Sequence, residues 1–143
     1  MSDDVFIRDG TLYDWDTIHD LESVIFDDGS ISKDMFTNIS NNPNHSIKVD
    51  ELDNRVVGYS IVLIIGRNAK ISRIGVDPCF QGIGIGTNLL ESIFQEAVEK
   101  KLKEINLFCL KNNFPALQLY KNNGFNICGN NWRYLDLLKT LEN

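Results

Sequence analysis

Residues 71–86 read Ile71-Ser-Arg-Ile-Gly-Val-Asp-Pro-Cys-Phe-Gln-Gly-Ile-Gly-Ile-Gly86 and lead into an amphipathic run, Thr87–Lys101. This order predicts a strand, a tight loop and a helix. The first turn of a helix has backbone N–H groups without internal partners, and the helix dipole adds a partial positive charge there. Glycines at Gly82, Gly84 and Gly86 would let an anion approach those donors closely. The segment therefore predicts a site for phosphate or pyrophosphate.

Three glycine-rich motifs are candidates for this loop. A Walker A loop ends in Gly-Lys-Ser/Thr, but Gly86 is followed directly by Thr87. In a Gly-x-Gly-x-x-Gly dinucleotide fingerprint, the third glycine would fall on Thr87 or Leu89, so that motif fails as well. The pattern that remains is Gln-x-x-Gly-x-Gly, with Gln81 as its first residue. Taken alone, the loop is also compatible with a glycine-rich turn that binds nothing.

Residues 113–125 form a second marked segment. Asn113 can cap a helix, and Pro115 is tolerated in a first helical turn, where its missing N–H is not needed. Gly124 offers a left-handed C-terminal stop. A short helix bounded by these residues is therefore expected, after one further helix and one further strand.

Together the two segments resemble the GNAT superfamily (Gcn5-related N-acetyltransferases). The first looks like the family's pyrophosphate loop, Gln/Arg-x-x-Gly-x-Gly/Ala, and the preceding Val76-Asp-Pro78 looks like its strand end. The second is similar to the family's Asn-x-x-Ala-x-x-x-Tyr-x-x-x-Gly-Phe segment, filled here by Asn113, Ala116, Tyr120, Gly124 and Phe125. The resemblance covers residues 56–129 well and residues 1–55 only as a general pattern. It is nearest to ribosomal-protein-alanine-type N-terminal acetyltransferases.

The resemblance implies acetyl-CoA as cosubstrate. It places the pantetheine arm beside Ile74 and Val76, with the Val76 N–H facing the thioester carbonyl, and gives Asn113 a contact with the same arm. Tyr120 would protonate the departing thiolate, since a phenol with a pKa near ~10 is protonated at neutral pH. Periodicity by itself favours the alternative that Tyr120 is a core residue. The pyrophosphate would lie against a run of seven residues: Gln81, Gly82, Ile83, Gly84, Ile85, Gly86 and Thr87.

The general base is not assigned. Some ribosomal-protein acetyltransferases place a glutamate five residues before the motif asparagine, and this chain has Phe108 there. Glu22, His45, Ser72 and Arg73 are polar candidates, but no spacing argument favours any of them. A water chain to solvent is a further alternative.

The preferred acceptor is a protein N-terminal α-amine. In enzymes of that type, the region after the first helix lines the peptide groove and a terminal hairpin covers it, which implies substrate contacts for Phe26 and Tyr134. Trp132 is expected to pack within that hairpin. A small-molecule amine (polyamine, amino acid or antibiotic) is the alternative acceptor, and a non-catalytic acyl-CoA-binding module is a third interpretation.

Composition narrows the functional class. The 143 residues have a net charge of −6, an isoelectric point near 4.8 and 43% apolar content, which predicts one domain over residues 1–143 with no nucleic-acid partner. The longest apolar run, Ile61–Ile65, is too short to span a membrane. Three cysteines without Cys-x-x-Cys spacing favour the cytoplasm, with Cys109 and Cys128 as core residues. No metal site is indicated, and the oligomeric state stays open.

The expected fold class is α/β (α+β), a mixed sheet flanked by helices on both faces. The GNAT resemblance further implies a sheet splayed between two central strands. Over 87–102, a period of 3.6 residues predicts one buried face, made by Leu89, Leu90, Ile93, Phe94, Ala97, Val98 and Leu102. The expected strands are 5–8, 46–50, 55–65, 69–76, 104–110, 125–128 and 132–138, with a terminal turn at 129–131; the other helices are 14–26, 32–39 and one from 113.

Overall fold

The computed structural model describes residues 5–26 and 31–141. Seven strands form one sheet in the order β1-β2-β3-β4-β5-β7-β6. The strands are β1 (Val5–Asp9), β2 (His45–Leu52), β3 (Arg55–Ile65), β4 (Asn68–Val76), β5 (Glu104–Leu110), β6 (Asn126–Asn131) and β7 (Tyr134–Thr140). The helices are α1 (Trp15–Ile25), α2 (Lys33–Asn41), α3 (Ile85–Glu99) and α4 (Phe114–Asn122), with short 3₁₀ turns at Leu12–Asp14 and Pro78–Phe80.

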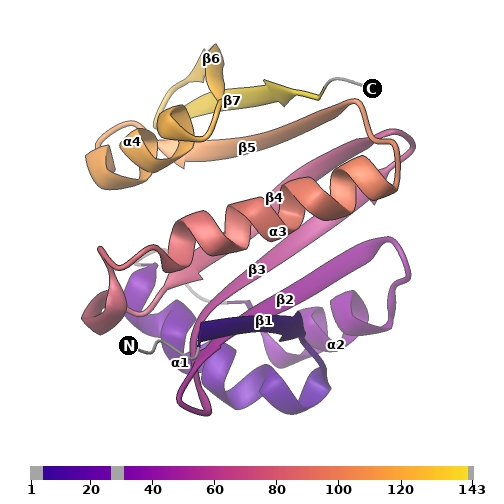
Figure 1. Cartoon of the computed structure of the whole chain (residues 1–143), viewed down its shortest axis with the longest axis vertical. Helices are drawn as coiled ribbons and strands as arrows, with labels where there is room; N and C mark the ends of the chain where they lie inside the picture. Colours follow the sequence, from indigo (N-terminus) through magenta and orange to yellow (C-terminus); the bar gives the residue numbers. More distant parts are fainter. Residues whose placement is uncertain (1–4, 27–30, 142–143) are drawn as a thin grey trace.

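Helices cover both faces of this sheet. On one face, α3 crosses the strands (Figure 1), and its buried residues join a core with β4, β5 and α4. On the other face, α1 and α2 pack on β2, β3 and β4 around Ile18, Phe36 and Tyr59. The expected mixed sheet flanked on both faces is confirmed. Within the described residues, no helix is both long and apolar enough to cross a bilayer.

The local signals in the sequence position most of these elements. Asp53 and Asn54 both have positive φ and close the β2–β3 hairpin, as a two-residue turn of the primed type requires. The Ser32 side chain accepts a hydrogen bond from Met35 N at 3.1 Å and so begins α2. Gly124, with φ +93°, follows α4 in the left-handed conformation expected of a helix stop.

The sheet divides between β4 and β5. These two strands are parallel, and their ladder holds only three residue pairs, Asn68 with Glu104 through Lys70 with Asn106. From Ile71 and Leu107 onward the two strands pair only with their outer neighbours. The splay that the resemblance implied is therefore present, and the carboxyl ends of β4 and β5 separate on either side of it (Figure 1).

A β-bulge at Ser72 lies on the β4 wall of the splay. The register passes from Ile61 opposite Arg73 to Val62 opposite Ile71, which leaves Ser72 without a cross-strand partner. A bulge of this kind breaks the alternation of side chains between the two sheet faces. Ile71 and Ile74 consequently both point toward α3, although three positions separate them.

Two expectations about the terminal hairpin are wrong. Asn131 still pairs with Tyr134, so the turn falls on Trp132 and Arg133 rather than on residues 129–131. Trp132 is 84% exposed with φ +36°, and its ring contacts only the Arg133 guanidinium, 5.8 Å away, among the ring contacts of the described residues. It does not pack within the hairpin, because it lies in the two-residue turn between the paired residues Asn131 and Tyr134.

Two expected core residues are exposed. Cys128 occupies a second bulge, where the register jumps from Ile127–Leu137 to Gly129–Asp136, on the edge strand β6. Val98 is 55% exposed, because it lies about 140° around the helix from Ile93 at ~100° per residue. Helix α3 also begins at Ile85, two residues earlier than expected.

Candidate active site

The glycine loop between β4 and α3 has an open, left-handed backbone. Gly82 has φ +83° and Gly84 has φ +93°, conformations that side chains rarely adopt. A Cβ atom built at either position would meet no other atom within 4 Å. The glycines are therefore required by the backbone and not by crowding within the protein, and the space beside them is open to a ligand.

Gly84 is the N-cap of α3, and no side chain caps this helix end. The free N–H groups of the first turn consequently face the open side of the loop, where an anion would meet them and the helix dipole together. Gly86 serves a different purpose, since its Cβ would come within 2.9 Å of Leu119 on α4. A side chain there would require Leu119 to move, so this glycine serves the packing of α3 against α4.

The start of the loop is fixed to the sheet. The Asp77 side chain accepts a hydrogen bond from Cys79 N at 2.9 Å and pairs with Arg55 at 3.4 Å. The Arg55 guanidinium also lies 5.2 Å from the Phe80 ring centroid. Gln81 donates from Nε2 to the carbonyl oxygen of Val76 at 3.4 Å, so the motif glutamine holds the loop to the end of β4.

The predicted cofactor residues lie around one end of the splay. Ile74 and Val76 belong to the part of β4 that has no ladder with β5. The side chains of Val76 and Ile85 pack inward in one apolar cluster, so only their backbone groups are available to a ligand, whereas Ile83 is 60% exposed. Because β4 and β5 are parallel, the loops that follow them lie at the same edge of the sheet.

On the β5 side of the splay, Asn113 is a helix cap. Its Oδ1 accepts a hydrogen bond from Ala116 N at 3.3 Å, and its side chain is exposed at the start of α4. Tyr120, two turns further along, is 7% exposed and packs edge-on against Phe125 at 5.9 Å. Burial and the neighbouring Cys109 thiol raise the pKa of Tyr120 above its ordinary value, so the phenol stays protonated.

On the α1 side of the sheet, Glu22 of α1, Tyr59 of β3, Arg73 of β4 and Phe26 at the end of α1 form one network around a buried carboxylate. Tyr59 donates its hydroxyl hydrogen bond to Glu22 Oε2, and both side chains are inaccessible to solvent. Arg73 lies with Nε 3.6 Å from Glu22 Oε1 and with its guanidinium 4.6 Å from the Phe26 ring. Sequence reasoning considered Glu22 and Arg73 separately, and Tyr59 carried no signal of its own.

The other candidate residues lie at separate places on the sheet, and His45 is at the end opposite to Val76. Tyr134 begins β7 opposite Leu110, on the side of β5 that faces away from β4 and the splay. Phe108 is 46% exposed, and the Lys70 ammonium lies 4.7 Å from its ring, so this position supplies an aromatic surface and no carboxylate. His45 begins β2, and burial lowers its pKa. Among the described residues, no group of three or more His, Cys, Asp or Glu side chains could hold a metal ion.

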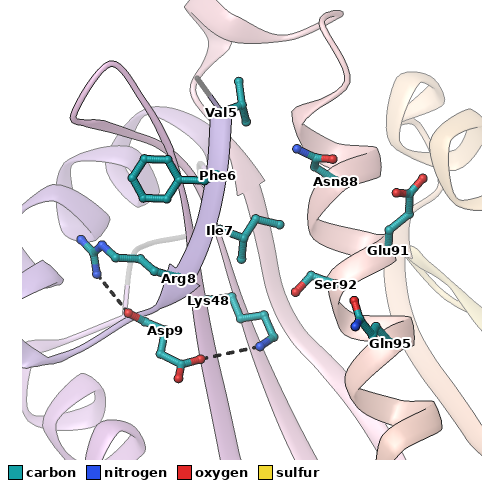
Figure 2. A pocket seen from close by; sticks show the side chains of 10 residues that line it. All are labelled: Val5, Phe6, Ile7, Arg8, Asp9, Lys48, Asn88, Glu91, Ser92 and Gln95. Atoms are coloured by element: carbon teal, nitrogen blue, oxygen red, sulfur yellow. Dashed lines mark hydrogen bonds and ion pairs between the residues drawn. The ribbon is translucent and has the colours of Figure 1, made fainter. Parts of the chain in front are cut away.

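A separate pocket of about 550 Å³ opens between β1 and α3. Figure 2 shows Asn88, Glu91 and Ser92 of α3 facing Ile7 of β1 and the Lys48 ammonium, which pairs with Asp9 at 3.7 Å. None of the predicted site residues lines it. The predicted cofactor site is therefore the loop and the splay, and not this pocket.

Known proteins that resemble this chain place it in a family. Residues 15–125 match the model of the acetyltransferase (GNAT) family. A Bacillus subtilis (strain 168) relative, provisionally named a ribosomal protein bS18-alanine N-acetyltransferase, is 27% identical over 118 residues, which are 82% of this chain and 78% of that protein.

Two solved structures share the fold. The PaiA N-acetyltransferase of Thermoplasma acidophilum, in complex with coenzyme A, has a TM-score of 0.86 at 20% identity, over 99% of this chain and 100% of that one. The ribosomal-protein-S18-alanine N-acetyltransferase of Escherichia coli has a TM-score of 0.85 at 18% identity, over 95% and 93%. Because the family model spans most of its length, the chain belongs to the GNAT family of acetyltransferases.

Proposed function

We propose that this chain is an acetyl-CoA-dependent N-acetyltransferase whose acceptor is the α-amine at the N-terminus of a protein. Acetyl-CoA binding is supported chiefly by the open, left-handed backbone at Gly82 and Gly84. These glycines lie at an uncapped helix start, beside the free edge of β4. The names of the Bacillus subtilis relative and of the Escherichia coli neighbour support the acceptor class.

Acetyl-CoA supplies an activated acetyl thioester. In our proposal the N–H groups of residues 82–87 bind its pyrophosphate, and Gln81 holds the loop in place. The backbone of Ile74 and Val76 orients the pantetheine arm together with Asn113, and the Val76 N–H donates to the thioester oxygen. Such preorganised donors stabilise charge as it develops.

Tyr120 is the proposed proton donor to the departing thiolate. Its raised pKa keeps the hydroxyl protonated over the neutral pH range, which a donor requires. The proton of the attacking amine leaves by solvent in this scheme, since Phe108 stands where a carboxylate would be needed. Phe26 and Tyr134 would line the acceptor side.

We further propose that residues 1–143 work as one domain in the cytoplasm. All three cysteines are free, and Cys79 and Cys128 are exposed, which suits a reducing compartment.

Turnover of acetyl-CoA over a panel of acceptors tests the proposal. The panel holds short peptides with free N-termini, the same peptides with blocked N-termini, and small amines such as spermidine. We expect turnover with the free peptides and none with the blocked ones. Turnover with small amines alone would show that the acceptor is a small-molecule amine and not a protein N-terminus. Acetyl-CoA binding without turnover of any acceptor would show that the chain is a non-catalytic acyl-CoA-binding module.

A further inference from the structure

The Ser72 bulge determines where Arg73 points. Regular alternation from Ile71, which faces α3, would send the Arg73 side chain to the same α3 face. The extra residue in β4 turns it to the α1 face instead, where it meets Glu22 and Phe26. Arg73 thus lies on the acceptor side of β4, directly before the Ile74–Val76 segment.

Arg73 is held in place by Glu22, a buried carboxylate that has further hydrogen-bond partners. Glu22 is 1% exposed and binds through both carboxylate oxygens: Oε2 accepts from the Tyr59 hydroxyl, and Oε1 accepts from Ile31 N at 3.1 Å. Oε1 also pairs with Arg73 Nε at 3.6 Å. A buried carboxylate needs this number of partners, and its charge balances that of the guanidinium.

The same support connects Arg73 to the region expected to bind the acceptor. Phe26 lies under the guanidinium at 4.6 Å, and Ile31 is bonded to Glu22, so both flanks of residues 27–30 are attached to this network. The Tyr59 ring also lies close against β4, since a Cβ atom at Gly75 would come within 3.0 Å of it.

Arg73 retains donors for a ligand. Its side chain is 27% exposed, and within residues 5–26 and 31–141 no hydrogen bond engages its N–H groups. A guanidinium fixed by an ion pair on one edge and an aromatic ring on one face presents its remaining N–H groups in a set direction.

We propose that Arg73 binds an oxygen separated from the acceptor amine by two carbon atoms, either a peptide carbonyl or a carboxylate, and that Glu22 and Tyr59 position it. The inference rests on the proposed function and narrows it, since an amine without such an oxygen would lose this contact. The acceptor is then an α-amino compound: a peptide N-terminus or an amino acid.

Three matched probes separate these sources: alaninamide carries a carbonyl, alanine a carboxylate, and 2-aminopropane neither. For the wild type we expect kcat/KM with alaninamide to exceed that with 2-aminopropane by roughly 10–100-fold, the range for a hydrogen bond to a charged group. Arg73→Gln should collapse that ratio, chiefly through KM, and Arg73→Lys should restore part of it. Alanine above alaninamide would identify the carboxylate as the natural partner.

The controls separate specificity from structure. Arg67→Gln makes the same charge change at an exposed position in the β3–β4 turn and should leave the ratio as in the wild type. Glu22→Gln and Tyr59→Phe should lower the ratio while the calorimetric affinity for acetyl-CoA is kept. If Arg73→Gln lowers kcat/KM equally for all three probes, Arg73 is a structural residue and the inference is wrong.

The proposed acceptor contact of Arg73 can also be tested if no amine is turned over. Ligand-observed NMR with the CoA-loaded protein then measures binding of the same three probes. Selective loss of alaninamide and alanine binding in Arg73→Gln would support the acceptor site while contradicting the proposed catalysis. Equal binding of all three probes to the wild type would overturn the inference.

Discussion

Tyr120 has two roles in this account: it is a core side chain, and it is the proposed general acid. It is buried against Phe125 and belongs to the core that α3, α4 and β5 share. Cys109, the thiol that contributes to its raised pKa, is on β5 at the wall of the splay. Removal of the Tyr120 hydroxyl therefore distinguishes a role in core packing from a role as proton donor.

Tyr120→Phe removes that hydroxyl and little volume. If Tyr120 protonates the thiolate, kcat should fall by roughly 10²–10⁴-fold while acetyl-CoA affinity changes little. Turnover and melting temperature are measured on one preparation, with Tyr13→Phe, at a tyrosine that is 98% exposed, as the matched control. A lower melting temperature with full turnover per folded molecule would assign Tyr120 to the core alone.

Asp50 predicts a pH dependence of stability. It is fully buried, and burial raises its pKa to about 6 against a smaller, lowering effect of the neighbouring Asn88 side chain. An unfolded aspartate has a pKa of about 3.9. Between about pH 4 and pH 6 the folded state therefore binds the proton that the unfolded state has released, so this group's contribution to stability falls as pH rises.

Asp50→Asn should remove the decrease in stability that ionisation of Asp50 causes as pH rises. Its free energy of unfolding should exceed that of the wild type by up to about 3 kcal/mol above pH 6, and the difference should shrink toward pH 4. Asp14→Asn is the contrast: pairing with Arg8 lowers the pKa of Asp14, so its contribution is present at neutral pH and is lost on acidification. Denaturant unfolding between about pH 2 and pH 8 checks both, since the contribution of Asp14 is lost below about pH 4. Equal pH slopes for wild type and Asp50→Asn between about pH 4 and pH 6 would contradict the account.

At the scale of elements, the sequence predicts what short-range physics determines. The 3.6-residue stripe of α3, the primed turn at Asp53–Asn54 and the Gly124 stop each follow from neighbours within one turn of chain. The bulge at Ser72 does not, because it is a property of the β3–β4 register and leaves no local signature. The position of the terminal turn is likewise a property of the β6–β7 register, which contains a bulge at Cys128 and pairs Asn131 with Tyr134.

Helix α3 offers a direct test of its packing. Leu90 is fully buried in the shared core, so Leu90→Ala should cost about 2–5 kcal/mol of unfolding free energy. Val98→Ala on the same helix removes apolar volume at a site that is 55% exposed and should stay within about 0.5 kcal/mol. Denaturant unfolding of both variants measures this; similar costs would mean that the buried face is assigned wrongly. Phe94, half-buried against Phe125, should fall between them.

At the scale of the whole molecule, the candidate site is a product of topology. The parallel β4–β5 pair brings two loops to one edge of the sheet, and its early separation leaves a strand edge free between them. Two motifs almost thirty residues apart are adjacent in space for that reason, although each is recognisable in the sequence from its own local spacing. The Glu22–Tyr59–Arg73 network draws on α1, β3 and β4 at positions without any shared motif, so only the folded chain reveals it.

An acidic chain that binds an anionic cofactor must do so locally. With a net charge of −6, long-range attraction does not favour acetyl-CoA, so binding has to depend on the N–H groups and dipole at the start of α3. Gly84→Asp sets a side chain and a negative charge against that position, where a Cβ otherwise meets open space. Gly66→Asp makes the same change at another left-handed, uncrowded glycine, with φ +60° in the β3–β4 turn.

Calorimetric titration of acetyl-CoA into the wild type, Gly84→Asp and Gly66→Asp therefore tests the central claim most directly, with circular dichroism as the check on folding. The account predicts binding by the wild type and by Gly66→Asp, and its near-complete loss in a natively folded Gly84→Asp. Wild-type affinity in the folded Gly84→Asp variant would contradict it and move the cofactor away from this loop.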